Sequence, residues 1–364
     1  MTRDDQAFGQ APGKEASRRK LVLGMISHAD AFQVLLLQAA EGGRGKVLFG
    51  ESLQRAREAA LPFMLGEEFP SVYLEHPLIG DPSLDVTVLF GGIEPGTRVD
   101  SPIAGEHAAM LDWYAVVRRE REEICCGFEL DTKEETPPMA GIHFQPRTNV
   151  DLVRPFCDAA GEPDRADLYL DLASRMPVRW PLSYFGLFRG RLGSPLRACG
   201  YLSDVEIKAC ASNPNRLAEV FDTIGFTAYD EAMLAQITTL MATAPHAVDF
   251  QFDVFSDGRL GPTFGIDVLF GIERPEAVLA TFEDGVGARV MGLLEDWGVA
   301  DGRWRVAVRS AFARAIPVTL DDGGVGRYAF TLMPQWVKAR WTDGVLQPSK
   351  LYHLAKGTLL DSKD

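Results

Sequence analysis

Short stretches in which apolar and polar residues alternate recur along this chain, and they predict β-strands. The stretches are rich in Val, Ile, Phe and Tyr and cover residues 85–90, 124–131, 141–145, 184–188, 196–202, 248–255, 263–270, 328–341 and 349–354. Ser256-Asp257-Gly258 and Thr342-Asp343-Gly344 are typical turn sequences between such stretches. Neighbouring strands are therefore expected to pair as antiparallel hairpins.

Apolar residues spaced three or four apart predict helices between these hairpins. The helical stretches lie at about residues 29–41, 51–65, 106–120, 148–174, 213–243 and 274–312. One or two helices followed by a two-stranded hairpin is thus a unit that recurs about five times. This order differs from the strand-helix-strand alternation of a doubly wound parallel sheet, which is not expected here.

The hairpins also resemble one another in sequence. Phe128-Glu129-Leu130-Asp131 matches Phe250-Gln251-Phe252-Asp253, and Gly141-Ile142 in the next strand matches Gly265-Ile266. An ordered series of matches indicates internal duplication. We interpret residues 121–204 and 247–356 as two repeats, and residues 72–120 as a partial echo of them.

The pattern predicts a single domain over residues 20–356, an α/β protein of the α+β type. In this fold class, duplicated antiparallel hairpins alternate with helices. Residues 1–19 are polar and carry no periodic pattern, so we expect a disordered tail, and residues 357–364 are interpreted as a second tail.

Composition restricts the class of partner. The chain has 51 acidic and 37 basic residues, a net charge of −14, which opposes binding to nucleic acid or to an anionic membrane. It has no apolar run of about 18 residues and begins with a charged segment, so we expect a cytoplasmic protein without a membrane span. The five cysteines lack CxxC spacing, and no metal site is predicted.

Alternation sorts the side chains of each strand onto two faces. Phe128 lies opposite Glu129, and Val337 lies opposite Lys338 and Arg340. The apolar faces are expected to meet the helices. If the sheet closes into a barrel, the charged faces line a shared interior in which charges interact at reduced dielectric; in an open sheet they meet bulk water.

The repeated hairpins, with Lys338-x-Arg340 on one strand and Lys350-x-Tyr352 on its neighbour, resemble the ABBA aromatic prenyltransferases. The resemblance implies a closed or nearly closed antiparallel β-barrel, ringed by helices, that holds an isoprenyl diphosphate. It assigns diphosphate binding to Arg191, Arg197, Lys338, Arg340 and Lys350, shielding of the allyl cation to Tyr201 and Tyr352, and catalytic contact with the acceptor to Glu129 or Asp253.

Two strands depart from this family pattern. Asp267 stands where a basic residue is expected, and the strand beginning at Gly141 offers only His143. The likeness extends over about residues 50–355. It implies no certain cofactor; Mg²⁺ bound together with a diphosphate substrate is the one cofactor that it leaves open.

Two functions follow from these observations. The resemblance implies a transferase of natural-product biosynthesis that moves an isoprenyl group from its diphosphate to an aromatic or peptide acceptor. The alternative is a non-catalytic accessory protein that binds a precursor peptide in a ribosomal-peptide (RiPP) pathway, since residues 336–357 are similar to uncharacterised proteins of such gene clusters. The basic hairpin favours the enzyme and the acidic surface the accessory protein, so the sequence leaves open whether the chain is an enzyme.

Overall fold

The computed structural model describes residues 28–66, 69–135, 137–244, 246, 248–319 and 324–360. Its helices are α1 (His28–Ala39), α2 (Arg44–Leu48), α3 (Ser52–Ala60), α4 (Ala108–Glu120), α5 (Val153–Ala159), α6 (Pro163–Arg175), α7 (Asp204–Ser212), α8 (Pro214–Ile224), α9 (Glu231–Thr243), α10 (Glu276–Glu283), α11 (Val286–Asp296) and α12 (Arg303–Arg309). Single turns of 3₁₀ helix occur at Glu41–Gly43, Leu61–Phe63 and Val150–Leu152. Within these described residues, no helix is both long enough and apolar enough to cross a membrane.

The strands form one antiparallel sheet. They are β1 (Ser71–Pro77), β2 (Asp85–Phe90), β3 (Cys125–Leu130), β4 (Gly141–Gln145), β5 (Leu182–Leu187), β6 (Leu196–Leu202), β7 (Val248–Val254), β8 (Leu260–Leu269), β9 (Phe312–Thr319), β10 (Val325–Thr342), β11 (Val345–Leu346) and β12 (Lys350–Leu360).

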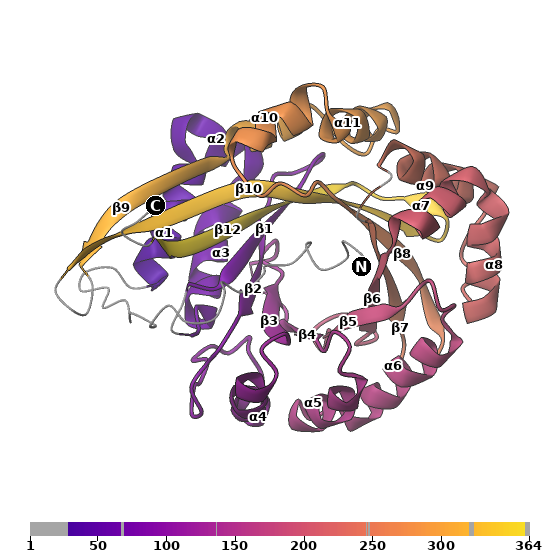
Figure 1. The fold of residues 1–364 in the computed structure, drawn as a ribbon, viewed down its shortest axis with the longest axis horizontal. Coiled ribbons are helices and arrows are strands. Elements are labelled where there is room, and N and C mark those ends of the chain that lie inside the picture. The colour runs from indigo at the N-terminus through magenta and orange to yellow at the C-terminus, as the bar shows by residue number, and fades with distance from the viewer. Residues whose placement is uncertain are drawn as a thin grey trace.

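Ten of these strands close into a barrel, which confirms the predicted fold class (Figure 1). The order around the ring is β10-β12-β1-β2-β3-β4-β5-β6-β7-β8, and β8 then pairs back with β10. The closing ladder joins residues 263–269 of β8 to residues 336–342 of β10. Five hairpins therefore contribute two strands each, and closure removes the free edges that an open sheet would expose.

The helices lie around the outside of the ring (Figure 1). One large apolar core joins the outward faces of the strands to the helices and includes Phe128, Phe250, Trp180 and Trp341. A second, small cluster of Tyr73, Tyr352 and Leu354, with Leu89 and Trp336 packed against it, is separate from that core. The barrel wall thus divides an apolar exterior layer from a distinct interior.

The structure differs from the sequence expectations at three strands. β1 was not predicted, because Glu75, His76 and Pro77 interrupt its apolar pattern. β9 begins at Phe312, where the predicted helix ended, and pairs with the first half of β10. β12 continues to Leu360, four residues into the segment interpreted as a tail, because β10 extends beyond the ring and residues 356–360 pair with it.

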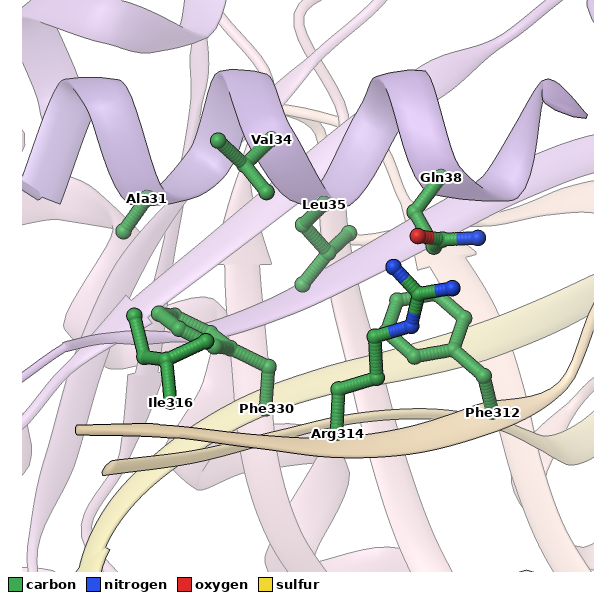
Figure 2. A pocket seen from close by; sticks show the side chains of 8 residues that line it. All are labelled: Ala31, Val34, Leu35, Gln38, Phe312, Arg314, Ile316 and Phe330. Carbon is green, nitrogen blue, oxygen red and sulfur yellow. The ribbon is translucent and has the colours of Figure 1, made fainter. Parts of the chain in front are cut away.

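Helix α1 covers the strands that extend beyond the ring. A surface groove of about 90 Å³ separates it from β9 and β10, lined by Ala31, Val34, Leu35, Gln38, Phe312, Arg314, Ile316 and Phe330. Figure 2 shows the α1 side chains facing those of the two strands across this groove. The groove is largely apolar and lies outside the barrel, so the charged interior is a separate site.

A buried histidine pair joins the barrel wall to α12. His353 Nε2 lies 3.0 Å from the carbonyl oxygen of Ala307, and its Nδ1 lies 3.3 Å from His76 Nε2. A carbonyl oxygen only accepts, so His353 carries its proton on Nε2 and accepts from His76 through Nδ1. Burial lowers the pKa of His353 to about 4; burial, then His353 and Arg303, lower the pKa of His76. Both rings are therefore neutral near pH 7.

Acidification should destabilise the fold through this pair. In the unfolded chain His353 takes up a proton near pH 6.5, whereas in the fold it does so only near pH 4. The free energy of unfolding should therefore fall between these pH values, by about 3 kcal/mol from His353 alone. Denaturant titrations from pH 4 to 7 measure this slope. His353→Gln should reduce it, and His246→Gln, at an exposed position, should not; equal slopes in all three proteins would contradict the assignment.

Candidate active site

The register of the barrel places a layer of charged side chains on its inner face. Directly opposed residues of antiparallel strands project to the same side of a sheet. Lys350 of β12 is opposed to Lys338 of β10, and Lys338 is opposed to Asp267 of β8. Asp267 is in turn opposed to Asp249 of β7. Strands far apart in the sequence thus contribute to one polar layer.

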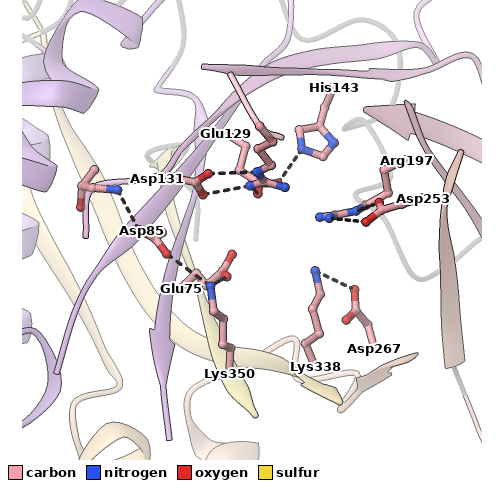
Figure 3. Close-up of polar contacts among 12 residues, drawn as sticks. Glu75, Asp85, Glu129, Asp131, His143, Arg197, Asp253, Asp267, Lys338 and Lys350 are labelled. Atoms are coloured by element: carbon pink, nitrogen blue, oxygen red, sulfur yellow. Dashed lines mark hydrogen bonds and ion pairs between the residues drawn. The ribbon is translucent and has the colours of Figure 1, made fainter. Parts of the chain in front are cut away.

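Three of the predicted cations, Arg197, Lys338 and Lys350, lie around a common central space, and each of the three meets a carboxylate (Figure 3). Arg197 Nε donates to Asp253 Oδ1 at 2.9 Å. Lys338 Nζ lies 3.8 Å from Asp267 Oδ2. The charged side chains of Arg197, Lys338 and Lys350 therefore converge inside the barrel.

Lys350 joins two acids of the first hairpin. Its Nζ donates to Glu75 Oε1 and lies 3.3 Å from Asp85 Oδ2, while Asp85 Oδ1 accepts from the backbone N–H of Thr132 at 2.8 Å. Burial opposes ionisation of Glu75, but the charges of Lys350 and Lys338 bring its pKa below the usual value. Burial raises the pKa of Asp85 to about 6. The ion pairs of this cluster link β12 to β1 and β2.

Arg191 reaches the interior from the loop between β5 and β6. Its guanidinium lies 3.8 Å from the centre of the Phe188 ring, donates to Asp131 at 2.9 Å and also donates to Glu129. The other oxygen of Glu129 lies 2.8 Å from His143 Nε2. Burial would raise the pKa of Glu129, but Arg191 and His143 hold it well below the usual value. Glu129 is consequently an anion with two fixed partners.

Arg340 differs from the other predicted cations. It lies on the same face of β10 as Lys338 and is solvent-exposed. Within the described part of the chain, it makes no ion pair. Burial of part of the side chain and the neighbouring charge of Arg197 lower its pKa, so an arriving anion would relieve an unbalanced positive charge here.

An aromatic cluster adjoins the cations. Trp336 lies between Tyr73 and Tyr352, with ring centres 4.6 and 4.9 Å apart, and is stacked on Tyr352 at 21°. Lys338 Nζ lies 4.9 Å from the centre of the Tyr352 ring. Faces of such rings carry partial negative charge and attract cations. The cluster can therefore accommodate an apolar group that becomes positively charged.

Asp249 and Asp267 form a buried pair of acids. Asp249 Oδ2 accepts from Tyr184 Oη, and Asp267 Oδ2 lies 3.3 Å from Gln251 Nε2. Each has a second oxygen that is buried without a hydrogen-bond partner in the described structure. Burial, and then the charge of Asp267, raise the pKa of Asp249; burial raises that of Asp267 to about 6. Protons are thus retained at this pair more readily than at ordinary aspartates.

The structure brings the predicted site residues together. Strand residues on the inner face are Glu129, Arg197, Tyr201, Asp253, Lys338, Arg340, Lys350 and Tyr352, and Arg191 joins them from its loop. Sequence reasoning did not predict that most of the cations would be neutralised by acids. Glu75 was missed because β1 was not recognised, although the alternation of Tyr73 and Glu75 was a usable signal. Asp85 begins a predicted strand but was not assigned to the site.

No metal site is formed by the protein alone within the described ranges. There, no group of three or more His, Cys, Asp and Glu side chains is arranged to hold a metal ion.

Comparison with known proteins finds similarity in three-dimensional structure. No protein-family model matches the chain, and no curated protein matches it in sequence. The 5-dimethylallyltryptophan synthase from Streptomyces coelicolor matches with a TM-score of 0.50 and 12% identity, over 90% of this chain and 97% of that one. The 6-dimethylallyltryptophan synthase from Micromonospora olivasterospora, solved with DMASPP and Trp, matches with a TM-score of 0.51 and 14% identity, over the same shares of both chains.

The chain has the ABBA prenyltransferase fold. This confirms the resemblance that the repeated hairpins and the Lys350-x-Tyr352 strand indicated. At 12 to 14% identity the match establishes the arrangement of the strands and helices. The ligands of this chain depend on its own side chains.

Proposed function

We propose that this protein is a prenyltransferase that moves an isoprenyl group from its diphosphate to an aromatic acceptor inside the barrel. The observation that carries the proposal is the convergence on one interior of Arg197 from β6, Lys338 and Arg340 from β10 and Lys350 from β12, beside the aromatic cluster of Tyr73, Trp336 and Tyr352. Both structural neighbours named above are dimethylallyltryptophan synthases, which supports an aromatic acceptor.

The reaction would use both the cations and the aromatic cluster of the interior. The bond between the allylic carbon and the diphosphate oxygen breaks, and its electrons leave with the diphosphate, where the cations stabilise the developing negative charge. The allyl cation that remains is stabilised by the faces of Tyr352 and Trp336. An aromatic carbon of the acceptor then forms the new bond and loses its proton to a base.

Diphosphate must compete for the cations with the protein's own acids. Arg197 and Lys338 each have one carboxylate partner, and Lys350 and Arg191 each have two. Arg340 is available without such exchange in the described structure. We therefore propose that diphosphate binds first to Arg340 and then draws Lys338 and Arg197 from their partners, with Mg²⁺ as an optional companion of the diphosphate.

Turnover with a substrate panel tests this function. The protein is incubated with dimethylallyl or geranyl diphosphate and with tryptophan, tyrosine, indole or short aromatic peptides, with Mg²⁺ or with EDTA. Mass spectrometry should detect a prenylated acceptor together with released diphosphate. Absence of product with every pair, combined with absence of diphosphate binding, would remove the proposal.

A peptide-binding accessory protein is the second candidate, and the charge of the interior favours it. Seven acids take part in the interior network, Glu75, Asp85, Glu129, Asp131, Asp249, Asp253 and Asp267, against the five predicted cations. Acids therefore outnumber the predicted cations in this interior, and such an excess of acids would suit a cationic peptide. Calorimetry with synthetic precursor peptides separates the candidates, because this function predicts peptide binding without any diphosphate.

A further inference from the structure

His143 and Glu129 form a dyad on the inner face of the barrel. Glu129 lies on β3 and His143 on β4, and the imidazole Nε2 lies 2.8 Å from Glu129 Oε2. Their side chains are 11% and 12% exposed, so the contact is largely shielded from water. Such a contact between an imidazole and a carboxylate fixes the ring and selects its tautomer.

The tautomer follows from the charge of Glu129. Since Arg191 and His143 keep the pKa of Glu129 well below the usual value, the carboxylate can only accept, and His143 carries a proton on Nε2. In the neutral imidazole the lone pair is then on Nδ1. Within the described residues, Nδ1 has no hydrogen-bond partner, so it is available to a ligand.

The dyad adjoins the proposed diphosphate cations. Phe188 contacts three of the groups concerned: its ring centre lies 5.5 Å from that of His143, 3.8 Å from the guanidinium carbon of Arg191 and 4.7 Å from that of Arg197. In Figure 3, His143 and Arg197 lie next to each other at the rim of the same central space. An acceptor placed between them would have its reacting carbon near both the leaving diphosphate and Nδ1.

The backbone around His143 supports a close fit of the ring. Its cross-strand neighbours on both sides are glycines, Gly127 of β3 and Gly186 of β5. A Cβ atom at Gly186 would lie 3.2 Å from His143 Cε1, which is a tight contact. The ring position is therefore set by Glu129 and Phe188, with no neighbouring side chain on either strand to displace it.

We propose that His143 is the base of the transfer reaction and that Glu129 is its positioning residue. This inference rests on the proposed function and refines it, because the family resemblance implied contact with the acceptor only for Glu129 or Asp253. After the acceptor carbon has bonded to the allyl cation, the hydrogen on that carbon passes as a proton to Nδ1. The electrons of the broken C–H bond restore the aromatic ring, and the charge on the imidazolium is balanced by Glu129.

Charged groups on the neighbouring elements face His143. Glu129 on β3 and the charges of Arg191 and Arg197 surround it, with Asp131 bonded to Arg191 beyond them. Loss of the Glu129 charge would leave the two arginines unopposed near the ring. Transfer of the proton to His143 would then be less favourable, so kcat should fall and the deuterium isotope effect should increase in Glu129→Gln.

His143→Gln tests the base directly, since glutamine can still donate to Glu129 but cannot accept a proton at neutral pH. With an acceptor deuterated at the reacting carbon, we expect about a 100-fold loss in kcat and a larger deuterium isotope effect. Binding of dimethylallyl S-thiolodiphosphate should change less than about twofold, because the cations remain. His246→Gln, at an exposed position, is the control for loss of a histidine and should match the wild type.

The outcomes separate the two proposals. If the wild type gives no product with any acceptor, the proposed function fails and the role of His143 falls with it. If the wild type is active and His143→Gln keeps at least half of its kcat with an unchanged isotope effect, the base assignment alone is overturned. A variant that binds the thiolodiphosphate far more weakly at unchanged kcat would also overturn it, because His143 would then serve binding.

Discussion

Replacement of Arg340 by methionine should weaken binding of dimethylallyl diphosphate by about 10- to 100-fold, the range expected when a charged hydrogen-bonding group is lost. Arg340 is exposed and, among the described residues, makes no ion pair. Diphosphate can thus reach it without first separating an acid from it. Methionine keeps an unbranched side chain and removes the guanidinium. Isothermal titration calorimetry with the uncleavable thiolodiphosphate measures the change.

The controls separate a specific contact from a general charge effect. Lys208→Met on α7 makes the same change of charge at an exposed site outside the barrel and should leave the affinity unchanged. Arg340→Lys keeps the charge but loses the paired donors, so it should be intermediate. Unchanged affinity in Arg340→Met would show that the diphosphate, if bound, lies elsewhere.

Replacement of Lys350 by methionine should destabilise the fold by about 3 kcal/mol, because two largely buried carboxylates lose their common cation. Lys350 Nζ contacts Glu75 and Asp85, whose side chains are 6% and 10% exposed. The lysine side chain is itself 35% exposed, which places the expected cost at the lower end for breaking a buried pair. Thermal and denaturant unfolding at pH 7.5 measure the loss.

A second substitution should recover part of this stability. Glu75→Gln in the Lys350→Met background removes one of the two carboxylates that have lost their cation. It should raise the free energy of unfolding above that of the single variant. Arg119→Met is the matched control, since its ion pair with Glu94 is exposed on both sides and should contribute less than about 1 kcal/mol. An equal loss in Lys350→Met and Arg119→Met would contradict the interior cluster.

Much of the fold could be predicted from the sequence because the strands and turns of each hairpin follow from local patterns. Strict alternation gave the strands of four hairpins, and turn residues such as Asp257-Gly258 gave their connections. β1 was not predicted because Glu75 and His76, in its second half, place polar side chains on both faces of the strand. Its inner face carries the charged site and its outer face the buried His76, so the tertiary environment, not the local pattern, stabilises that strand.

The candidate site could be predicted only in part. Alternation placed Lys338, Arg340 and Lys350 on one face, which the structure confirms. It could not show which acids face them, because Glu75 and Lys350 are 275 positions apart and meet only after β12 pairs with β1. His143 was noted only as a departure from the family pattern. Its contact with Glu129 depends on the register between β3 and β4, which the sequence does not specify.

A crystal structure of the protein with dimethylallyl S-thiolodiphosphate would show whether diphosphate binds inside the barrel. We expect the diphosphate within hydrogen-bond distance of Arg340, Lys338 and Arg197, with the dimethylallyl group against Trp336 and Tyr352. We also expect Lys338 to have moved away from Asp267. A ligand bound outside the ring, or an empty interior with every ion pair intact at saturating ligand, would refute the proposed binding site.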